Sequence, residues 1–489
     1  MINKENTLGA TVRKMKPAAI AAMCLTMITV SSAAPVYAGT GTDRLNEVLT
    51  ILENNHLKGV SEEELSEAAI EGMIRSLDDP YTQYYSESDY SSFLNAIDNE
   101  YAGIGIRLSQ DSEGVYIVEV IPSSPAERKG LKAGDHIKSV NGKPATKLST
   151  DEVRDALQGT KGTSVVMRVQ SNGSANTRLL TIQRDTVQLP VAESRYMGGG
   201  IGYIALTTFS DDAGPLFTRK LNALKAQGMK SLIFDLRDNS GGYVDAAVEV
   251  AKNFIAEGVL MHTRDVNGKD DPMLITEGVK ANFKVILLVN ELSASASEIL
   301  AGALQDYDVA QVVGTRTFGK GVVQNVWTLE QGGYLKATFE EYFTPDQHKV
   351  HEYGIRPDVS VEGYASQLLT AYRLAGGGNL DVILGTDTVT LNGSEFLGGV
   401  DVIRAKGNVY VPANVLSSVI GGKSSWNKAG RSLVIQGGGR SVSFRSGNPA
   451  LIVKEGISYI ELNKFVQSFR QVKWSLHPKG IRIQLTGGK

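Results

Sequence analysis

Three segments of the sequence carry residue types that can perform acyl-transfer chemistry. The first is the run 290–298 (Asn-Glu-Leu-Ser-Ala-Ser-Ala-Ser-Glu), which follows an apolar stretch and precedes a helical pattern. A serine at a strand-to-helix turn exposes its hydroxyl, and the N-terminus of a helix favours developing negative charge. Ser295 is therefore a candidate nucleophile. The segment from Ser295 to Glu298 also fits the S-x-x-E capping box of an ordinary helix start.

The second segment centres on Lys320, which stands between two glycines. A serine hydroxyl is a poor nucleophile and needs a base within reach. A lysine amine can act as that base if burial lowers its pKa from about 10.4 to ~7–8. The apolar neighbours Phe318, Val322 and Val323 can supply a dry environment. Gln324 can hydrogen-bond the amine without adding a charge that would raise its pKa.

The third segment is 235–242 (Asp-Leu-Arg-Asp-Asn-Ser-Gly-Gly), a glycine turn after an apolar run. Backbone amides in such a turn can point at the oxygen of a reacting carbonyl. The competing base is a histidine, but His262, His348 and His351 stand in no recognisable triad context. His348 and His351 also lack acidic neighbours that would complete a metal site, so we expect neither a metal nor a cofactor.

Residues 187–366 must position these three segments, and their pattern predicts an α/β core. Apolar runs of buried-strand length occupy 201–207, 231–236 and 285–290, and helical stretches occupy 216–226 and 298–305. Strands that alternate with helices imply parallel pairing through crossover connections. The candidate serine and the glycine turn then follow the ends of two such strands.

Residues 99–186 change to short β-rich runs separated by glycine. The order S-P-A-x-x-x-G-L-x-x-G-D-x-I-x-x-V-N-G, from Ser124 to Gly142, resembles a PDZ domain of the bacterial protease-associated type. The resemblance implies a peptide-binding loop at Gly103, Ile104, Gly105 and Ile106. Glycines there free backbone amides to converge on a terminal carboxylate, while an open strand edge pairs with the peptide.

The two ends of the chain have different characters. Residues 1–38 combine a basic start, a short apolar run and small residues before Gly39, which is typical of a secretory signal peptide. Residues 39–98 have helical periodicity and form either a small helical cap or an association surface. Residues 367–489 are rich in glycine and repeat a pattern at a spacing of about 49 residues. They resemble the two-part stalk-like domain of copper amine oxidases.

Composition excludes several classes of protein. A chain of 489 residues with a net charge of −3 gives no electrostatic case for binding nucleic acid. The single cysteine, Cys24, rules out a disulfide framework and lies within the predicted signal peptide. A chain without that segment has no cysteine, so a thiol cannot be its nucleophile.

The combination of motifs over residues 41–366 resembles the carboxyl-terminal processing peptidases, a serine protease family that uses a Ser–Lys dyad. The resemblance implies that Ser295 is the nucleophile, Lys320 the general base, and Gln324 the residue that orients the lysine. It assigns the oxyanion hole to the amides of Ala296 and Gly241, or of Gly242 if the loop alignment shifts by one.

We therefore expect an α/β multidomain chain: a helical N-terminal region, a β-rich PDZ domain, a crotonase-like α/β protease core and a C-terminal α+β repeat domain. The expected function is that of a secreted or envelope-associated serine endopeptidase acting on proteins or peptides with free C-termini. The resemblance also implies a homodimer. Two alternatives stay open: a catalytically silent PDZ scaffold of the cell envelope, and an acyl-CoA enzyme of the crotonase type.

Overall fold

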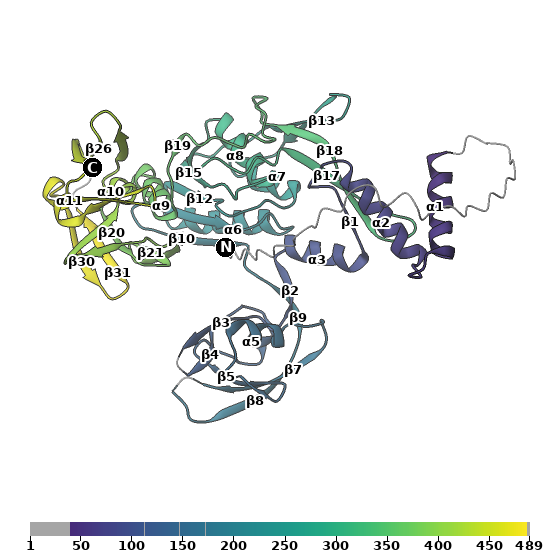
Figure 1. The fold of residues 1–489 in the computed structure, drawn as a ribbon. Coiled ribbons are helices and arrows are strands. Elements are labelled where there is room, and N and C mark those ends of the chain that lie inside the picture. The colour runs from purple at the N-terminus through teal and green to yellow at the C-terminus, as the bar shows by residue number, and fades with distance from the viewer. Residues whose placement is uncertain (1–39, 112, 146, 172, 487–489) are drawn as a thin grey trace, which may run out of the picture. The chain divides into compact units, whose positions relative to one another are not determined.

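A computed structural model describes residues 40–111, 113–145, 147–171 and 173–486 (Figure 1). They form two compact units, divided between Ser76 and Leu77. No helix within the described residues is both long and apolar enough to cross a membrane. The predicted signal peptide, residues 1–38, lies outside the described residues.

The first unit contains two helices, α1 (Gly41–Asn55) and α2 (Glu62–Arg75). Each begins at a capping box, in which the hydroxyl of Thr40 or Ser61 accepts a hydrogen bond from the amide three residues on. Neither helix has a buried residue, and Leu45 of α1 is 40% exposed. The unit is helical, as the periodicity predicted, and several of its apolar side chains are exposed, among them Val48, Ile51 and Met73.

The second unit begins with a strand, β1 (Gln83–Tyr85), and a helix, α3 (Glu87–Ile97), and continues into the PDZ region. That region has a sheet of β3 (Ile106–Asp111), β4 (Gly114–Val120), β5 (His136–Val140), β6 (Lys143–Pro144), β7 (Ser164–Gln170) and β8 (Thr177–Gln183). Its helices are α4 (Pro125–Arg128) and α5 (Thr150–Leu157). The chain enters the region through β2 (Glu100–Gly103) and leaves it through β9 (Asp185–Gln188), and these two strands pair with each other. Ile117, Ile137 and Met167 are fully buried in the core of this region.

The α/β core is built on a six-stranded sheet. In spatial order its strands are β10 (Ala192–Tyr196), β11 (Ile201–Leu206), β12 (Ser231–Asp235), β15 (Lys284–Val289), β16 (Ala310–Gly314) and β19 (Val359–Ser360). Strand β10 is antiparallel to β11, and every other pairing is parallel. The predicted parallel arrangement of the three apolar runs is confirmed.

Successive residues of a strand point to opposite faces of a sheet. Helices pack on both faces of this sheet. The helices are α6 (Ala213–Ala226), α7 (Val244–Ala251), α8 (Ala296–Asp306) and α9 (Tyr364–Leu374). On one face, Leu232 and Leu287 share a core with α6, α7 and α8. On the other face, Ile233 and Leu288 share a core with α9.

A second sheet flanks the core and carries the lysine segment. It consists of β1, β13 (Gly258–Arg264), β14 (Asp270–Ile275), β17 (Val322–Thr328) and β18 (Tyr334–Phe343). Strand β18 pairs with β1, β13 and β17. The loop that contains Lys320 therefore begins after β16 of the six-stranded sheet and ends at β17, on the edge of this second sheet.

The C-terminal region has three small sheets and two helices. Its strands are β20 (Leu380–Leu384), β21 (Thr388–Leu391), β22 (Ser394–Leu397), β23 (Ile403–Ala405), β24 (Asn408–Pro412), β25 (Lys423–Asn427), β26 (Ser432–Gly437), β27 (Arg440–Arg445), β28 (Leu451–Lys454), β29 (Ile457–Glu461), β30 (Val472–His477) and β31 (Gly480–Leu485). Its helices are α10 (Ala413–Val419) and α11 (Leu462–Ser468). The order hairpin, helix, hairpin occurs twice, around α10 and around α11, and fits the predicted repeat.

The C-terminal region is not separate from the α/β core, which differs from the domain division expected from the sequence. One continuous hydrophobic cluster joins Tyr203 and Ile233 of the six-stranded sheet to Val382 and Phe396 of the C-terminal sheets. The rings of Tyr203 and Phe396 meet edge to face, with centroids 4.9 Å apart. The glycine-rich composition suggested a boundary near residue 367, but helix α9 runs across it and packs against the core.

Candidate active site

Ser295 lies in the turn that joins β15 to α8. Its backbone has a φ of 54° and a ψ of −117°, and a positive φ is uncommon for a residue other than glycine. Strain of this kind at a strand-to-helix turn is typical of a nucleophile that projects into a site. The predicted strand-to-helix turn is confirmed, and Ala296 begins the helix.

One cavity of about 420 Å³ contains the residues predicted to perform the chemistry. Ser295, Lys320 and Gln324 line it, together with Gly241 and Gly242 of the glycine loop. These residues come from three segments that are far apart in the sequence. The structure brings all three segments to one place.

Burial of the Lys320 side chain lowers its pKa to about 8. The positive charge of Lys336, which lines the same cavity, acts in the same direction, while the negative charges of Glu298 and Asp79 oppose it. The ammonium lies 5.1 Å from the centre of the Tyr81 ring. A substantial fraction of this lysine is therefore a neutral amine, able to accept a proton, in mildly alkaline solution.

Glu298 connects the serine turn to the lysine loop. Its carboxylate accepts hydrogen bonds from the amides of Ser295 at 3.0 Å, Gly319 at 2.7 Å and Lys320 at 2.8 Å. The hydroxyl of Thr317 donates a fourth, at 2.5 Å. Burial raises the pKa of Glu298, and these hydrogen bonds oppose the shift. From its spacing in the sequence, Glu298 is predicted only to cap the helix. Its contacts with the lysine loop are seen only in the structure.

Gln324 reaches the cavity through an irregularity in the sheet. The register of β17 against β18 shifts between Val323 and Gln324, and such a bulge re-aims a side chain. The Gln324 amide group donates to the carbonyl of Val322 at 3.2 Å and to the hydroxyl of Thr338 at 3.4 Å. The side chain thus shares the cavity with Lys320 and is held there by the strands.

The glycine loop after β12 lies against Ser295. A Cβ on Gly241 would be 2.8 Å from the Cβ of Ser295, and the Gly241 amide donates to the side-chain oxygen of Asn239 at 2.9 Å. Within the described residues, neither the amide of Gly242 nor that of Ala296 donates a hydrogen bond. Of the two glycine amides considered for the oxyanion hole, that of Gly242 is thus the one without a partner.

The histidines weighed as alternative bases lie elsewhere. His262 pairs with Asp270 at 2.9 Å on the second sheet, and the side chain of His348 is 72% exposed. His351 lines a different cavity, beside Thr338 and Glu352. The cavity that contains Ser295 has no histidine among its described lining residues.

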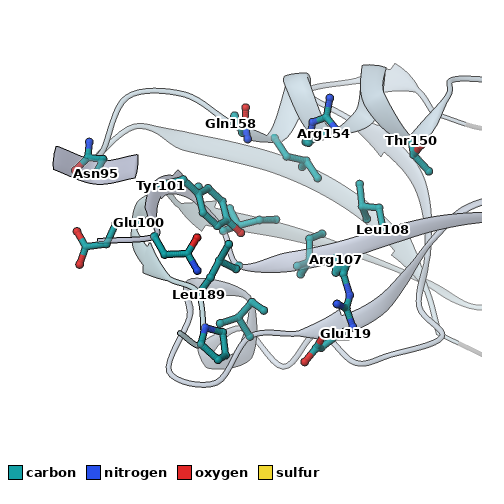
Figure 2. Close-up of a pocket in the computed structure, with 18 of the residues that line it drawn as sticks. Asn95, Glu100, Tyr101, Arg107, Leu108, Glu119, Thr150, Arg154, Gln158 and Leu189 are labelled. Carbon is teal, nitrogen blue, oxygen red and sulfur yellow. Dashed lines mark ion pairs between the residues drawn. The ribbon is translucent and has the colours of Figure 1, made fainter. Parts of the chain in front are cut away.

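The predicted peptide-binding loop borders a second cavity, of about 730 Å³ (Figure 2). Residues 103–106 line it together with Leu108 of β3 and Thr150 and Leu157 of α5. A groove between the edge of a strand and a helix is how PDZ domains bind an extended peptide. The loop therefore opens on a groove of the expected kind.

Tyr101 stands in this groove, next to the loop (Figure 2). A Cβ on Gly103 would lie 2.5 Å from Cε2 of the Tyr101 ring, so the ring packs directly on that glycine. Burial raises the pKa of the Tyr101 phenol, and the nearby amides of Gly105 and Ile106 act in the opposite direction. The phenol thus lies beside two amides of the loop predicted to receive a peptide carboxylate, a proximity that the sequence did not indicate.

Comparison with known proteins identifies the family. The profile of peptidase family S41 matches residues 200–361, and the PDZ domain profile matches residues 93–170. The chain is 33% identical over 321 residues to the carboxy-terminal processing protease CtpA of Bacillus subtilis, a match that covers 65% of this chain and 69% of the relative. This chain belongs to the carboxy-terminal processing protease family. Residues 23–88 match the profile of the activating protease CtpB N-terminal domain.

Other members of the family are similar over the same share of the chain. A probable CtpA-like serine protease of Staphylococcus aureus is 35% identical over 325 residues, and the match spans 64% of that relative's length. The solved structure of the photosystem II D1 C-terminal processing protease is 28% identical and aligns with 66% of this chain and 94% of its own, with a TM-score of 0.40.

Proposed function

We propose that this chain is a serine endopeptidase in which Ser295 is the nucleophile and Lys320 the general base, and that it cleaves polypeptides from their C-terminal region. The observation that carries the proposal is the shared cavity of Ser295, Lys320 and Gln324, in which burial lowers the pKa of Lys320 to about 8. Membership of the carboxy-terminal processing protease family supports it.

Acylation follows from the chemistry of the two side chains. The neutral amine of Lys320 takes the proton from Ser295 Oγ as that oxygen attacks the carbonyl carbon of the scissile peptide bond. The lysine ammonium then gives this proton to the departing nitrogen, the C–N bond breaks, and the C-terminal fragment leaves. Gln324 would keep the amine directed at the serine without adding charge.

Backbone amides would stabilise the negative oxygen of the tetrahedral intermediate. The amide of Ala296 and a glycine amide of the loop 238–242 are the donors we propose, since both border Ser295. In deacylation, Lys320 takes a proton from water while the water oxygen attacks the ester carbonyl. The proton passes to Ser295 Oγ as the ester bond breaks, which restores the starting state.

We further propose that the PDZ groove captures the free, apolar C-terminus of the substrate at residues 103–106. The groove between β3 and α5 supports this role. The signal-peptide pattern of residues 1–38 supports an extracytoplasmic location, secreted or at the cell envelope. The exposed apolar side chains of α1 and α2 support association of two copies through the N-terminal helices.

The test uses peptides with free apolar C-termini, incubated with residues 39–489 and analysed by mass spectrometry. We expect the wild type to shorten the peptides. We expect Ser295→Ala and Lys320→Ala to slow cleavage by roughly 10³-fold or more, because each removes one member of a unit that acts together.

The matched control is Lys349→Ala, which removes an exposed lysine paired with Glu341 at 2.8 Å and should leave cleavage unchanged. Intact peptides with every variant would contradict the proposal and favour a silent scaffold. Turnover of an acyl-CoA instead of a peptide would favour an enzyme of the crotonase type.

A further inference from the structure

Tyr364, the first residue of helix α9, packs against the glycine loop 238–242 and the residue before it. The guanidinium of Arg237 lies 4.9 Å from the centre of the Tyr364 ring. Arg237 also donates to the carbonyl of Tyr364 at 3.0 Å and is held by a buried ion pair with Asp235. The base of the loop and the start of α9 are therefore one packed assembly.

The Tyr364 hydroxyl joins this loop to the nucleophile turn. It donates to the carboxylate of Asp238, a residue with a φ of 62°. The side-chain amide of Asn290 donates to the same carboxylate at 2.8 Å and to the Tyr364 hydroxyl at 3.2 Å. In return, Asn290 accepts the Asp238 amide at 2.9 Å. Asn290 follows β15 directly and begins the turn that ends at Ser295, so the phenol sits where the two loops meet.

The other side of Tyr364 is held by the C-terminal region. A Cβ on Gly398 would lie 2.2 Å from the Cβ of Tyr364, so only glycine allows this approach. Asn414, in helix α10, donates to the carbonyl of Glu362 at 2.9 Å, just before α9 begins. Burial raises the pKa of Tyr364, and its hydrogen bond to Asp238 acts in the same direction, so the phenol remains a proton donor.

We propose that Tyr364 is a positioning residue for the active site, through which the C-terminal region sets the distance between the glycine loop and the turn of Ser295. The inference rests on the proposed function, since it concerns the same site. It assigns the C-terminal region a part in catalysis. Tyr364 itself touches neither substrate nor reacting atoms.

The expected effect is on kcat. The loop amides stabilise charge only in the transition state, and donors displaced by a fraction of an ångström stabilise it less. We expect Tyr364→Phe to lower kcat by about 5–30-fold and to leave KM within about twofold. The affinity for a peptide boronic acid, whose serine adduct is tetrahedral and anionic, should fall in parallel with kcat.

Helix α9 offers a matched control in Tyr372→Phe. The Tyr372 hydroxyl donates to the carbonyl of Asn379 at 3.1 Å and accepts from Asn392 at 2.7 Å, both in the C-terminal region. This variant removes a buried tyrosine hydroxyl from the same helix without touching the glycine loop. It should lower the melting temperature as Tyr364→Phe does and leave kcat unchanged.

A double-mutant cycle tests whether Tyr364 acts through Asp238. Asp238→Asn keeps the shape of the side chain and weakens its acceptor, so the double variant should be no slower than the slower single variant. The full chain is used throughout, below the melting temperature of every variant.

The outcomes separate the inference from the proposed function. A kcat loss in Tyr364→Phe but not in Tyr372→Phe supports the inference. Equal kcat in Tyr364→Phe and the wild type, or independent effects in the cycle, overturns it while the protease assignment stands. If the wild type cleaves the peptides no faster than Ser295→Ala, the proposed function is wrong, and the inference that rests on it is wrong as well.

Discussion

The molecule contains two glycine loops whose backbone amides we propose to bind negative charge, and each has a tyrosine beside it. In the PDZ region, the Tyr101 ring packs on Gly103, and its phenol lies near the amides of Gly105 and Ile106. In the protease core, Tyr364 lies behind residues 238–242 and bonds to the side chain of Asp238. The two loops therefore differ in their surroundings: the Tyr101 ring occupies the groove in front of the first loop, whereas the second loop is held by Tyr364 from the C-terminal side of the core.

Both loops depend on glycine for the same steric reason. Gly105 has a φ of 83°, and a Cβ there would lie 2.2 Å from the Cβ of Ser124. Gly242 has a φ of 144°, and its Cβ would lie 2.3 Å from the carbonyl oxygen of Phe209. A side chain at either position must displace the neighbouring atoms. Substitution of Gly105 or of Gly242 therefore disturbs one loop at a time, and the effects on peptide binding and on cleavage can be measured separately.

The largest effect is expected from Gly242→Ala. Because the methyl group cannot fit against Phe209, the loop must move and its amides lose their alignment with Ser295. We expect kcat to fall by about 10²–10³-fold, the size of effect seen when an oxyanion donor is lost. Peptide cleavage measured at saturating substrate checks this.

The control for that variant is Gly228→Ala in the loop after α6. Gly228 has a φ of 86° and nothing within 4 Å of a Cβ, so it carries the backbone strain without the clash. If both alanine variants lost activity equally, backbone strain and not the placement of the loop would be responsible. In the PDZ loop, Gly105→Ala should instead raise KM and leave kcat unchanged.

Glu298→Gln should have the next largest effect. The glutamine side chain presents an NH₂ group to two of the four donors that surround the carboxylate, and each unpaired buried group costs about 1–3 kcal/mol. We expect a loss of activity of about 10–100-fold together with a lower melting temperature. Glu291 lies in the same turn as Ser295 and accepts a hydrogen bond from the Thr315 hydroxyl. The control variant Glu291→Gln should change neither the activity nor the melting temperature. Full activity in Glu298→Gln would contradict the linking role of this carboxylate.

Tyr101→Phe should strengthen peptide binding. The variant removes the phenol oxygen that lies near the two loop amides, so it no longer competes with a peptide carboxylate for them. We expect Kd to fall by about 3–10-fold, the size of one hydrogen bond. Fluorescence anisotropy of a labelled peptide ending in Leu-Ala-Ala, with Ser295→Ala as background, measures this.

Tyr116→Phe controls for the loss of a tyrosine hydroxyl elsewhere in the PDZ region, in β4, where Tyr116 packs against His136. An unchanged Kd in Tyr101→Phe would mean that the phenol does not compete with the peptide. Absence of binding by every variant would instead contradict the proposed role of the PDZ groove.

Lys336→Gln should have the smallest effect, a shift in pH dependence. In the proposed mechanism activity requires a neutral Lys320, so we expect the rate to rise with pH through the lysine pKa of about 8. The charge of Lys336 helps to lower that pKa, and its removal should move the midpoint to higher pH by a fraction of a unit. Lys349→Gln should leave the midpoint in place. A shift to lower pH would contradict the charge argument.

The sequence was sufficient to predict the parts of the site that depend on local pattern. The apolar run before Asn290 and the helical pattern after Ser295 predicted the strand-to-helix turn, and the structure has it. The lysine loop was predicted to be dry because of its apolar neighbours. Burial lowers the pKa of Lys320, and Val322 and Val323 line its cavity, but Phe318 is 57% exposed and lies outside that cavity. These properties reside in short segments, so spacing and residue type reveal them.

The parts that escaped prediction depend on contacts between distant segments. Glu298 has the spacing of a helix cap, but it also binds the lysine loop, about 20 residues further along the chain. Tyr101 and Tyr364 belong to no sequence motif. The roles proposed for them follow from the loops that lie beside them in the folded chain. A glycine-rich C-terminal region suggested an independent domain, whereas its apolar side chains complete one face of the core sheet.

The central claim is that a lysine of lowered pKa activates Ser295. Its most direct test is the pH dependence of single-turnover acylation of the wild type, measured from about pH 5 to pH 10 with a peptide ester. We predict one ascending limb with a midpoint near pH 8, the pKa of Lys320. A midpoint near 6.5, the ordinary value for histidine, or a rate independent of pH would contradict the account.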